Sequence, residues 1–221
     1  FSMFLSNTAT AAMMLTFLTP VLKVLPADGK GKTGLAMAIP VAANIGGMGT
    51  PIGTPPNAIA LKYLNDPEGL NLNIGFGAGG FALGVALQET GLAKHMIESI
   101  PFNTWPPVLM IIGSGLICYT MANFISHTAT AALLVPILAI AGSSMRENLS
   151  ALGGVETLLI GVAIGSSLAM ILPISTPPNA LAHATGMIQQ KDMEKVGIIM
   201  GIVGLILGYT MLIILGSHKM L

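Results

Sequence analysis

Residues 50–60 of the chain read TPIGTPPNAIA, and residues 172–182 read LPISTPPNALA. A second related pair precedes them, because residues 6–14 read SNTATAAMM and residues 126–134 read SHTATAALL. The two motifs recur in the same order, at offsets of 120 and 122 residues. The chain therefore contains an internal repeat, and each copy carries a polar tip followed by a proline-rich loop.

The composition is that of a membrane protein. Of the 221 residues, 53% are hydrophobic and 8% are charged, and the mean hydropathy is +0.80. A soluble domain usually carries about 25% charged residues, so most of the outside must face lipid or other apolar protein. The net charge of zero does not suggest a nucleic-acid partner, and the single Cys118 excludes an internal disulfide framework.

A spanning helix needs about 20 largely apolar residues, and segments of that size follow one another along the chain. Two of them, Leu35–Leu64 and Leu158–Ile188, are longer and are broken in the middle by Gly and Pro. Because proline lacks an N–H and clashes with the preceding turn, we expect the paired prolines to end the first half of each. The other apolar segments are Ala9–Leu25, Ala78–Ile100, Val108–Ile125, Thr128–Met145 and Val196–Leu215, the last with four closely spaced glycines that permit helix contact.

The loop charges give the two copies opposite orientations. Residues 23–32 carry three lysines against one aspartate, whereas residues 142–156 carry one arginine against two glutamates. By the positive-inside rule the first connection is cytoplasmic and the second lies on the opposite side. We therefore predict an inverted-topology repeat, with one copy over residues 1–77 and the other over residues 78–221. The predicted fold class is an all-α membrane protein with re-entrant hairpins and broken transmembrane helices.

The tips and loops suit small cations and anions. Non-helical backbone survives in hydrocarbon only beside a cavity or inside protein, and sites in inverted repeats lie where the copies meet. Free carbonyls with Ser, Thr and Asn oxygens suit a hard cation such as Na⁺, and half-helix N-termini attract an anion. No Asp or Glu lies in a tip or a broken loop, which favours sodium over proton coupling, because proton relays generally use carboxylates.

SNTAT in the first tip with GTPPNA in the first loop, in paired copies, resembles the divalent anion/sodium symporter family, the INDY-type dicarboxylate and citrate carriers. The resemblance covers nearly the whole chain but only part of a family member. It implies secondary active, sodium-coupled symport of a di- or tricarboxylate such as succinate, malate, fumarate or citrate. It also implies an elevator mechanism in a bacterial inner (plasma) membrane, with a transport domain that slides against a homodimeric scaffold.

The same resemblance implies roles for the tips and loops. Two sodium sites would be formed, by Ser6, Asn7 and Gly53 at the first tip and by Ser126, His127 and Ser175 at the second. The substrate carboxylates would contact Asn7, Thr8, Ser126, His127, Thr128 and Thr176. We expect Asn57 and Asn179, one in each loop, to cap the half-helices that follow.

Two features depart from the family pattern. His127 stands where the usual motif has Asn, so it either donates to a carboxylate, which could make binding pH-sensitive, or hydrogen-bonds across the tip. After residues 71–77 the chain runs directly into residues 78–81, where a family member has intervening scaffold helices, and more would precede Phe1. We expect the scaffold helices to be absent from this chain.

Functions of other classes remain as alternatives. A passive channel or a structural membrane subunit is the main one, although neither needs two hydroxyl-amide tips facing proline-broken loops. An intramembrane hydrolase would use Ser114 in Gly113-Ser114-Gly115, with His127 or His183 as its base. The repeat leaves Ser114 without a role, so we do not expect an enzyme.

Overall fold

The computed structural model describes residues 1–26, 30–50, 53–65, 104–124 and 126–218, and these ranges are helical with turns between the helices. The predicted all-α class is therefore confirmed. The weaker apolar segment Ala78–Ile100 and the predicted boundary between the copies lie outside the described residues.

Both copies contain a helix that starts at the tip, followed by a broken segment. In the first copy these helices are α1 (Asn7–Val24), α2 (Lys30–Gly47) and α3 (Pro55–Asn65). The second copy contains α6 (Pro107–Phe124), α7 (His127–Ser144), α8 (Arg146–Leu149), η2 (Ser150–Leu152), α9 (Gly154–Ser167), α10 (Pro177–Ala184) and α11 (Gln190–Ser217). Helices α2 and α3, and likewise α9 and α10, are the halves of the two predicted broken segments.

The paired prolines begin the second half of each broken segment. α3 begins at Pro55 and α10 at Pro177, whereas α2 has already ended at Gly47 and α9 at Ser167. The expectation that the prolines end the preceding helix is therefore wrong. Proline suits the first helical position, because its fixed φ is helical and an N–H there would have no intrahelical partner.

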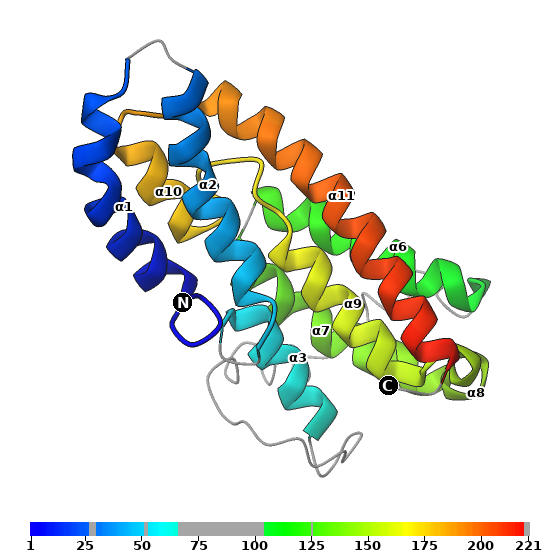
Figure 1. Ribbon diagram of the computed structural model, residues 1–221. Coiled ribbons are helices and arrows are strands. Elements are labelled where there is room, and N and C mark those ends of the chain that lie inside the picture. Colours follow the sequence, from blue (N-terminus) through cyan, green and yellow to red (C-terminus); the bar gives the residue numbers. More distant parts are fainter. Residues whose placement is uncertain (27–29, 51–52, 66–103, 125, 219–221) are drawn as a thin grey trace.

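The two copies exchange their second half-helices. α3 of the first copy packs against α7 and α9 of the second, and α10 of the second packs against α1 and α2 of the first. Figure 1 shows α10 beside α1 and α2, at the end of the molecule away from α8. Ile59 and Ala60 of α3 join the buried core of the second copy, and Ala182 of α10 joins Ala11 and Ala36. Each copy is thus completed by a helix of the other.

Helix α11 approaches its neighbours closely through its row of glycines. A Cβ at Gly197 would overlap the backbone of Met170 and Ile171, and a Cβ at Gly201 would overlap the hydroxyl of Tyr119. The predicted close contact is therefore confirmed, and α11 packs against both α9 and α2.

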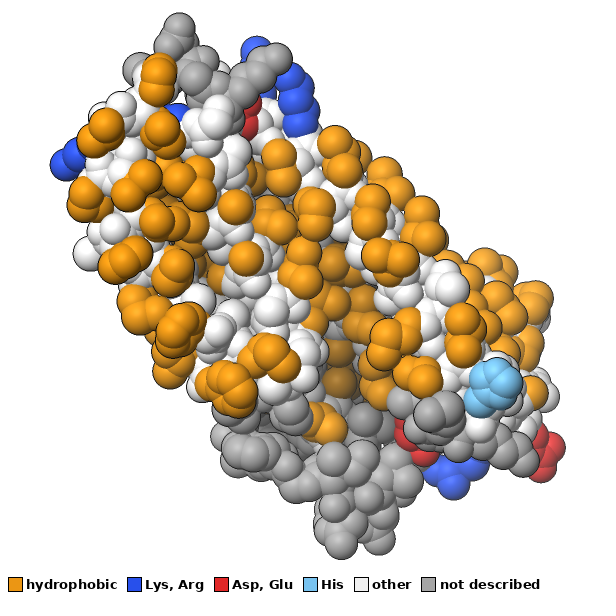
Figure 2. Space-filling view, viewed as in Figure 1, with side chains coloured by type: hydrophobic (Ala, Val, Ile, Leu, Met, Phe, Trp, Pro, Cys, Tyr) orange, Lys and Arg blue, Asp and Glu red, His pale blue; other side chains and the backbone are white. Residues whose placement is uncertain are grey.

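The outside of the described chain is apolar over its middle and charged at its ends. Figure 2 shows hydrophobic side chains over α1 and α11, with charged side chains gathered at the two ends. On α11, Ile206 and Leu207 are 61% and 65% exposed. By length and composition α6 and α11 could each cross a membrane, and the pair formed by Arg146–Leu152 and Gly154–Ser167, bent by 72°, could add a third span. The chain is therefore part of an integral membrane protein.

The two charged connections lie at opposite ends of the molecule. The end of α1, which leads into the lysine-rich connection, is far from α8, which carries Arg146 and Glu147 (Figure 1). This separation agrees with the expectation that the two connections face opposite sides of the membrane.

Candidate functional site

A cavity of about 220 Å³ lies where the two tips meet the two broken loops. It is lined by Ser6, Asn7, Thr8, Asn44, Thr54, Pro55, Ser126, His127, Thr128, Ser175, Thr176, Pro177 and Pro178. Eight of the nine binding residues predicted from the sequence are in this set, and Gly53 is the exception. A larger hollow of about 410 Å³ along α1 and α2 is lined mainly by apolar side chains. The tips and loops of both copies therefore share one cavity of a size that suits a small polar ligand.

Four helices begin at this cavity: α1, α3, α7 and α10. The hydroxyl of Ser6 caps α1 by accepting from the backbone N–H of Ala9 at 3.2 Å. The hydroxyl of Thr176 caps α10 by accepting from the backbone N–H of Asn179 at 3.2 Å. The first N–H groups of a helix have no intrahelical partner and carry a partial positive charge. The cavity thus lies in the field of four helix N-termini, two from each copy.

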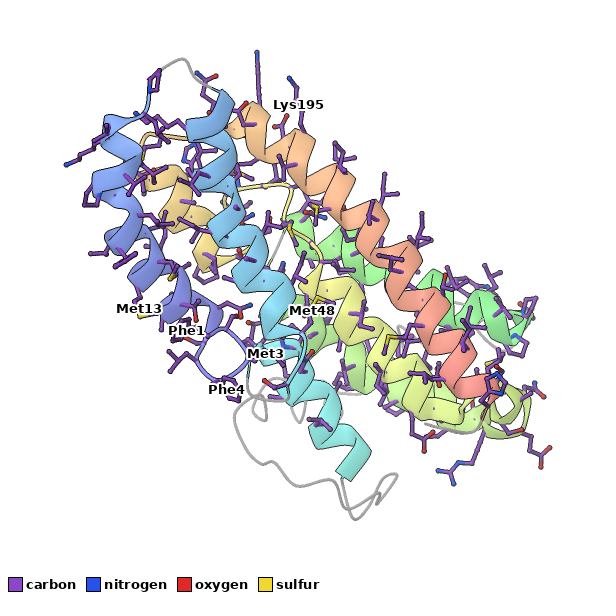
Figure 3. The ribbon with its side chains drawn as sticks, in the orientation of Figure 1. Phe1, Met3, Phe4, Met13, Met48 and Lys195 are labelled. Atoms are coloured by element: carbon purple, nitrogen blue, oxygen red, sulfur yellow. The ribbon has the colours of Figure 1, made fainter. Side chains whose placement is uncertain are left out.

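The polarity of the cavity comes from backbone and neutral side chains. None of the described side chains that line it belongs to Asp, Glu, Lys or Arg. Figure 3 shows Lys195 near the start of α11, well away from Met3 and Phe4 in the loop that leads to the first tip. An anion in the cavity would therefore be held by N–H groups, hydroxyls and amides, with helix dipoles as the source of positive potential.

The first tip is joined to the first broken loop through the Asn7 amide. The carbonyl oxygens of Ala43 and Gly53 lie 2.9 and 2.8 Å from one end of that amide. Carbonyl oxygens only accept hydrogen bonds, so this end is the nitrogen, and it also donates to Ser2 Oγ at 2.6 Å. The amide oxygen is then the end of Asn7 that is available to a cation. Gly53 does not line the cavity, and its carbonyl contacts the site through Asn7.

Two glycines allow this close approach of tip and loop. A Cβ at Gly47 would overlap the Asn7 amide, and a Cβ at Gly53 would overlap the backbone of Gly47. In the second copy the corresponding positions hold Ala169 and Ser175. The first site therefore requires bare backbone at two positions where the second carries side chains.

The second tip is held to its loop by His127, which is 6% exposed. Its Nε2 hydrogen-bonds to the carbonyl of Ala169, and its backbone N–H donates to the carbonyl of Ser175 at 3.4 Å. Because a carbonyl only accepts, Nε2 carries the ring proton, and a neutral ring then has an unprotonated Nδ1. Both bonds therefore join the tip to the broken loop that faces it. The remaining ring nitrogen is an acceptor, which suits a cation better than a carboxylate.

The hydroxyls of the other predicted residues differ in hydrogen bonding and in exposure. Ser175 is buried, and its hydroxyl donates to the carbonyl of Leu172 at 2.5 Å while accepting from the N–H of Leu172 at 3.1 Å. Thr8 and Thr128 are exposed, line the cavity and occupy the third position of their tips. These two threonines are therefore more accessible to an entering ligand than Ser175.

Asn57 and Asn179 hold the broken loops together. Asn57 Nδ2 donates to the carbonyls of Met48 and Thr50 at 3.0 and 2.9 Å. Asn179 Nδ2 makes the same two bonds to the second loop, at 2.9 and 3.3 Å. The expectation that their side chains cap the following half-helices is wrong, because the hydroxyl that precedes the prolines caps α10. Their amides instead donate to loop carbonyls that have no hydrogen-bond partner within a helix.

Two polar residues at the cavity were not expected from the sequence. Thr54 precedes the first paired prolines as Thr176 precedes the second, so the repeat itself could have indicated it. Asn44 lies near the end of α2, is fully buried, and donates to Thr176 Oγ1 and Asn179 Oδ1 of the other copy at 3.3 and 3.2 Å. An amide within an apolar membrane segment is costly unless it is hydrogen-bonded, and this was the available signal for Asn44.

Ser114, the nucleophile of the hydrolase alternative, lies inside α6. It is buried, and its hydroxyl donates to the carbonyl of Met110 in its own helix at 2.5 Å. It does not line the cavity that contains His127. This arrangement is that of a packing residue.

Comparison with known proteins relates the chain to membrane transporters. The family described as "Sodium:sulfate symporter transmembrane region" matches residues 68–220, and the family described as "Citrate transporter" matches residues 1–70. The Na(+)/dicarboxylate cotransporter 3 of Homo sapiens is 32% identical over 130 residues, which are 58% of this chain and 21% of that protein. The sodium-dependent dicarboxylate transporter SdcS of Staphylococcus aureus (strain USA300) is 34% identical over 146 residues, which are 62% of this chain and 26% of that protein.

A third relative, an uncharacterized transporter of Haemophilus influenzae, is 35% identical over 135 residues, which are 60% of this chain and 28% of that protein. The chain thus spans 21% to 28% of the length of these relatives. The symporter family nevertheless matches well over half of the chain, and its members are transporters rather than enzymes. The resemblance drawn from the tips and loops is confirmed, and the chain belongs to the sodium:sulfate symporter family of membrane transporters.

Proposed function

We propose that this chain forms the substrate- and sodium-binding part of a secondary transporter that carries a di- or tricarboxylate together with Na⁺. The observation that carries this proposal is one cavity at which both polar tips and four helix N-termini meet, and whose described lining residues include no Asp, Glu, Lys or Arg. Each N-terminus is equivalent to roughly half a positive charge. Four of them approach about two positive charges, which matches a dicarboxylate such as succinate.

Sodium ions would add the positive charge that the side chains do not supply. At the first tip, the Ser6 hydroxyl and the Asn7 amide oxygen are neutral oxygen ligands suited to Na⁺, and the Gly53 carbonyl fixes the Asn7 amide that presents this oxygen. At the second tip, the hydroxyls of Ser126 and Ser175 would be the oxygen ligands, and Nδ1 of His127 would add a neutral nitrogen acceptor. The described lining residues include no carboxylate that could carry a proton across, which favours sodium coupling over proton coupling.

The transport step, its substrate and its partners are proposed for a longer protein, because the chain spans 21% to 28% of the relatives described above. Two relatives are named as sodium-dependent dicarboxylate carriers, and the citrate transporter family matches the first 70 residues. These names support succinate, malate, fumarate and citrate as candidate substrates. The likeness to transporters of two bacteria supports the bacterial inner (plasma) membrane as the location.

The exchanged half-helices favour an elevator mechanism. α3 is packed in the second copy and α10 in the first, so opening the cavity by hinging the copies apart would expose both buried clusters. Moving the whole unit against a scaffold leaves those contacts intact. We therefore include in the proposal a homodimer formed through scaffold helices of the longer protein.

Calorimetric titration of the purified, detergent-solubilised chain with succinate, in sodium and then in choline buffer, tests the proposal. Binding in sodium that disappears in choline supports a coupled anion site at the two tips. Equal binding in both buffers overturns sodium coupling and favours the passive channel. If succinate, malate and citrate all fail to bind in sodium, the carboxylate assignment is overturned, and sulfate in the same buffer shows whether a different anion binds.

A further inference from the structure

The buried amide of Asn44 connects the two copies at the cavity. Asn44 belongs to α2 of the first copy, but both of its recorded hydrogen bonds go to residues of the second. Its Nδ2 lies 3.3 Å from Thr176 Oγ1 and 3.2 Å from Asn179 Oδ1. Asn44 and Thr176 both line the cavity, so this contact lies at the place where a ligand would bind.

The orientation of the Asn44 amide is fixed by Asn179, which is itself held by the second broken loop. Asn179 Nδ2 donates to the carbonyls of Met170 and Leu172 at 2.9 and 3.3 Å. Because these carbonyls only accept, the nitrogen of Asn179 must face them, and its oxygen must face Asn44. An oxygen there requires a donor, so Asn44 presents its nitrogen. Two backbone carbonyls of the second broken loop therefore determine, through Asn179, that the nitrogen of the Asn44 amide faces the second copy.

With the Asn44 amide in this orientation, the Thr176 hydroxyl keeps its proton available for a ligand. Thr176 Oγ1 accepts from Asn44 Nδ2 at 3.3 Å and from the backbone N–H of Asn179 at 3.2 Å. A hydroxyl oxygen has two lone pairs and one proton, so both lone pairs are engaged. The described part of the chain shows no acceptor for the proton. The hydroxyl at the cavity can therefore donate to an anion, but it has no lone pair left for a cation.

We propose that Asn44 is a positioning residue that fixes the Thr176 hydroxyl as a hydrogen-bond donor for a carboxylate group of the substrate. This inference deepens the proposed function and rests on it. It separates Thr176 from the sodium ligands, although both kinds of residue line the same small cavity. The Asn44 amide oxygen has no partner among the described residues. The two bonds of the amide nitrogen offset the cost of leaving this buried oxygen without a partner.

Among the residues that the structure describes, an amide that bonds across to the other copy in this way occurs on one side of the cavity. The position that corresponds to Asn44 in the second copy holds Ser166, whose hydroxyl donates to the carbonyl of Ala163 in its own helix at 3.0 Å. Ser166 does not line the cavity, so Thr54 receives no equivalent bond from it. The two halves of the cavity thus present different hydrogen-bonding groups, although their motifs are repeats of each other.

A double-mutant cycle tests the inference, with succinate affinity in sodium buffer and Na⁺ affinity in the absence of succinate as the two readouts. We expect Asn44→Ala and Thr176→Val each to weaken succinate binding by about tenfold or more, the loss typical of one hydrogen bond to a charged group. The double variant should bind succinate no more weakly than Thr176→Val alone, because Asn44 acts through Thr176. Na⁺ affinity should be unchanged in all three variants.

Additive losses in the double variant, or an equal loss of Na⁺ affinity, would overturn the positioning role. If Asn44→Ala does not fold, Thr176→Ser against Thr176→Val still decides the matter. Succinate binding should be kept by the serine and lost by the valine with Na⁺ affinity unchanged, and a loss of Na⁺ affinity in the valine variant overturns the inference. Failure of the wild-type chain to bind succinate in sodium would instead count against the proposed function itself.

Discussion

The Asn7 amide donates to the carbonyl of Gly53 at 2.8 Å, so the first tip and the first broken loop are one hydrogen-bonded unit. The bond depends on the absence of a side chain at Gly47, where a Cβ would overlap the amide. The nitrogen of Asn7 is thereby fixed on the loop, and its oxygen is the end left for a ligand.

Gly47→Ala should therefore weaken sodium-dependent succinate binding. The added methyl displaces the Asn7 amide from the loop carbonyls, and we expect a loss of at least about tenfold, as for one lost bond to a charged ligand. Calorimetry in sodium buffer measures it. Gly34→Ala is the matched control in the same helix, because a Cβ there meets nothing within 4 Å. If Gly47→Ala binds succinate with wild-type affinity, binding does not depend on the position of the Asn7 amide.

Asn7→Ala and Thr8→Ala should each abolish sodium-dependent dicarboxylate binding. The first removes the amide oxygen proposed to bind Na⁺, and the second removes an exposed hydroxyl at the cavity. Ser114→Ala should bind as the wild type does, since its hydroxyl is bonded inside α6. If Ser114→Ala were the damaging change and the tip variants were silent, the site would have to be placed elsewhere.

His127→Asn should keep sodium-dependent binding and remove its dependence on pH. In the wild type, a second ring proton would occupy Nδ1, the nitrogen that is otherwise free to accept, and would add a positive charge beside the proposed cation site. We therefore expect the Na⁺ affinity of the wild type to fall on acidification, and that of His127→Asn to stay level. A titration of Na⁺ affinity from neutral pH down to about pH 4 measures the difference, because burial keeps the ring neutral at mildly acidic pH. Parallel profiles for the two proteins would exclude His127 as the titrating group.

Gly197→Val should lower the thermal stability of the detergent-solubilised chain. Its side chain would be forced into the backbone of Met170 and Ile171, and such overpacking costs about 1–3 kcal/mol. Gly34→Val carries the same change at an open position of α2 and serves as the control. An unchanged melting temperature in Gly197→Val would mean that α11 can withdraw from the second loop without loss.

The repeat made much of this architecture predictable from the sequence. The motif pairs indicated both tips, both broken segments and eight of the residues that now line one cavity. The position of the helix breaks was not predictable in the same way, because paired prolines can end one helix or begin the next. In this chain Pro55 and Pro177 begin α3 and α10.

Contacts between the two copies could not be predicted from the sequence pattern either. Asn44 has no counterpart of the same type in the second copy, where Ser166 stands, so comparison of the two copies could not single it out. The roles of Asn57 and Asn179 were assigned wrongly for a related reason. Their place beside the prolines suggested a helix cap, but the carbonyls they satisfy become unpaired only in the folded loop.

The exchange of half-helices has a consequence for biosynthesis. α3 has 11 residues, which at about 1.5 Å per residue is too short to span a bilayer core of about 30 Å by itself. The helices that bury Ile59 and Ala60 are encoded far downstream, so α3 must remain without its partners while the ribosome translates them. When α10 finally emerges, it must return to α1 and α2, which were made first. Neither copy can mature before the other, and insertion of this chain therefore reaches its native packing only in a late, concerted step.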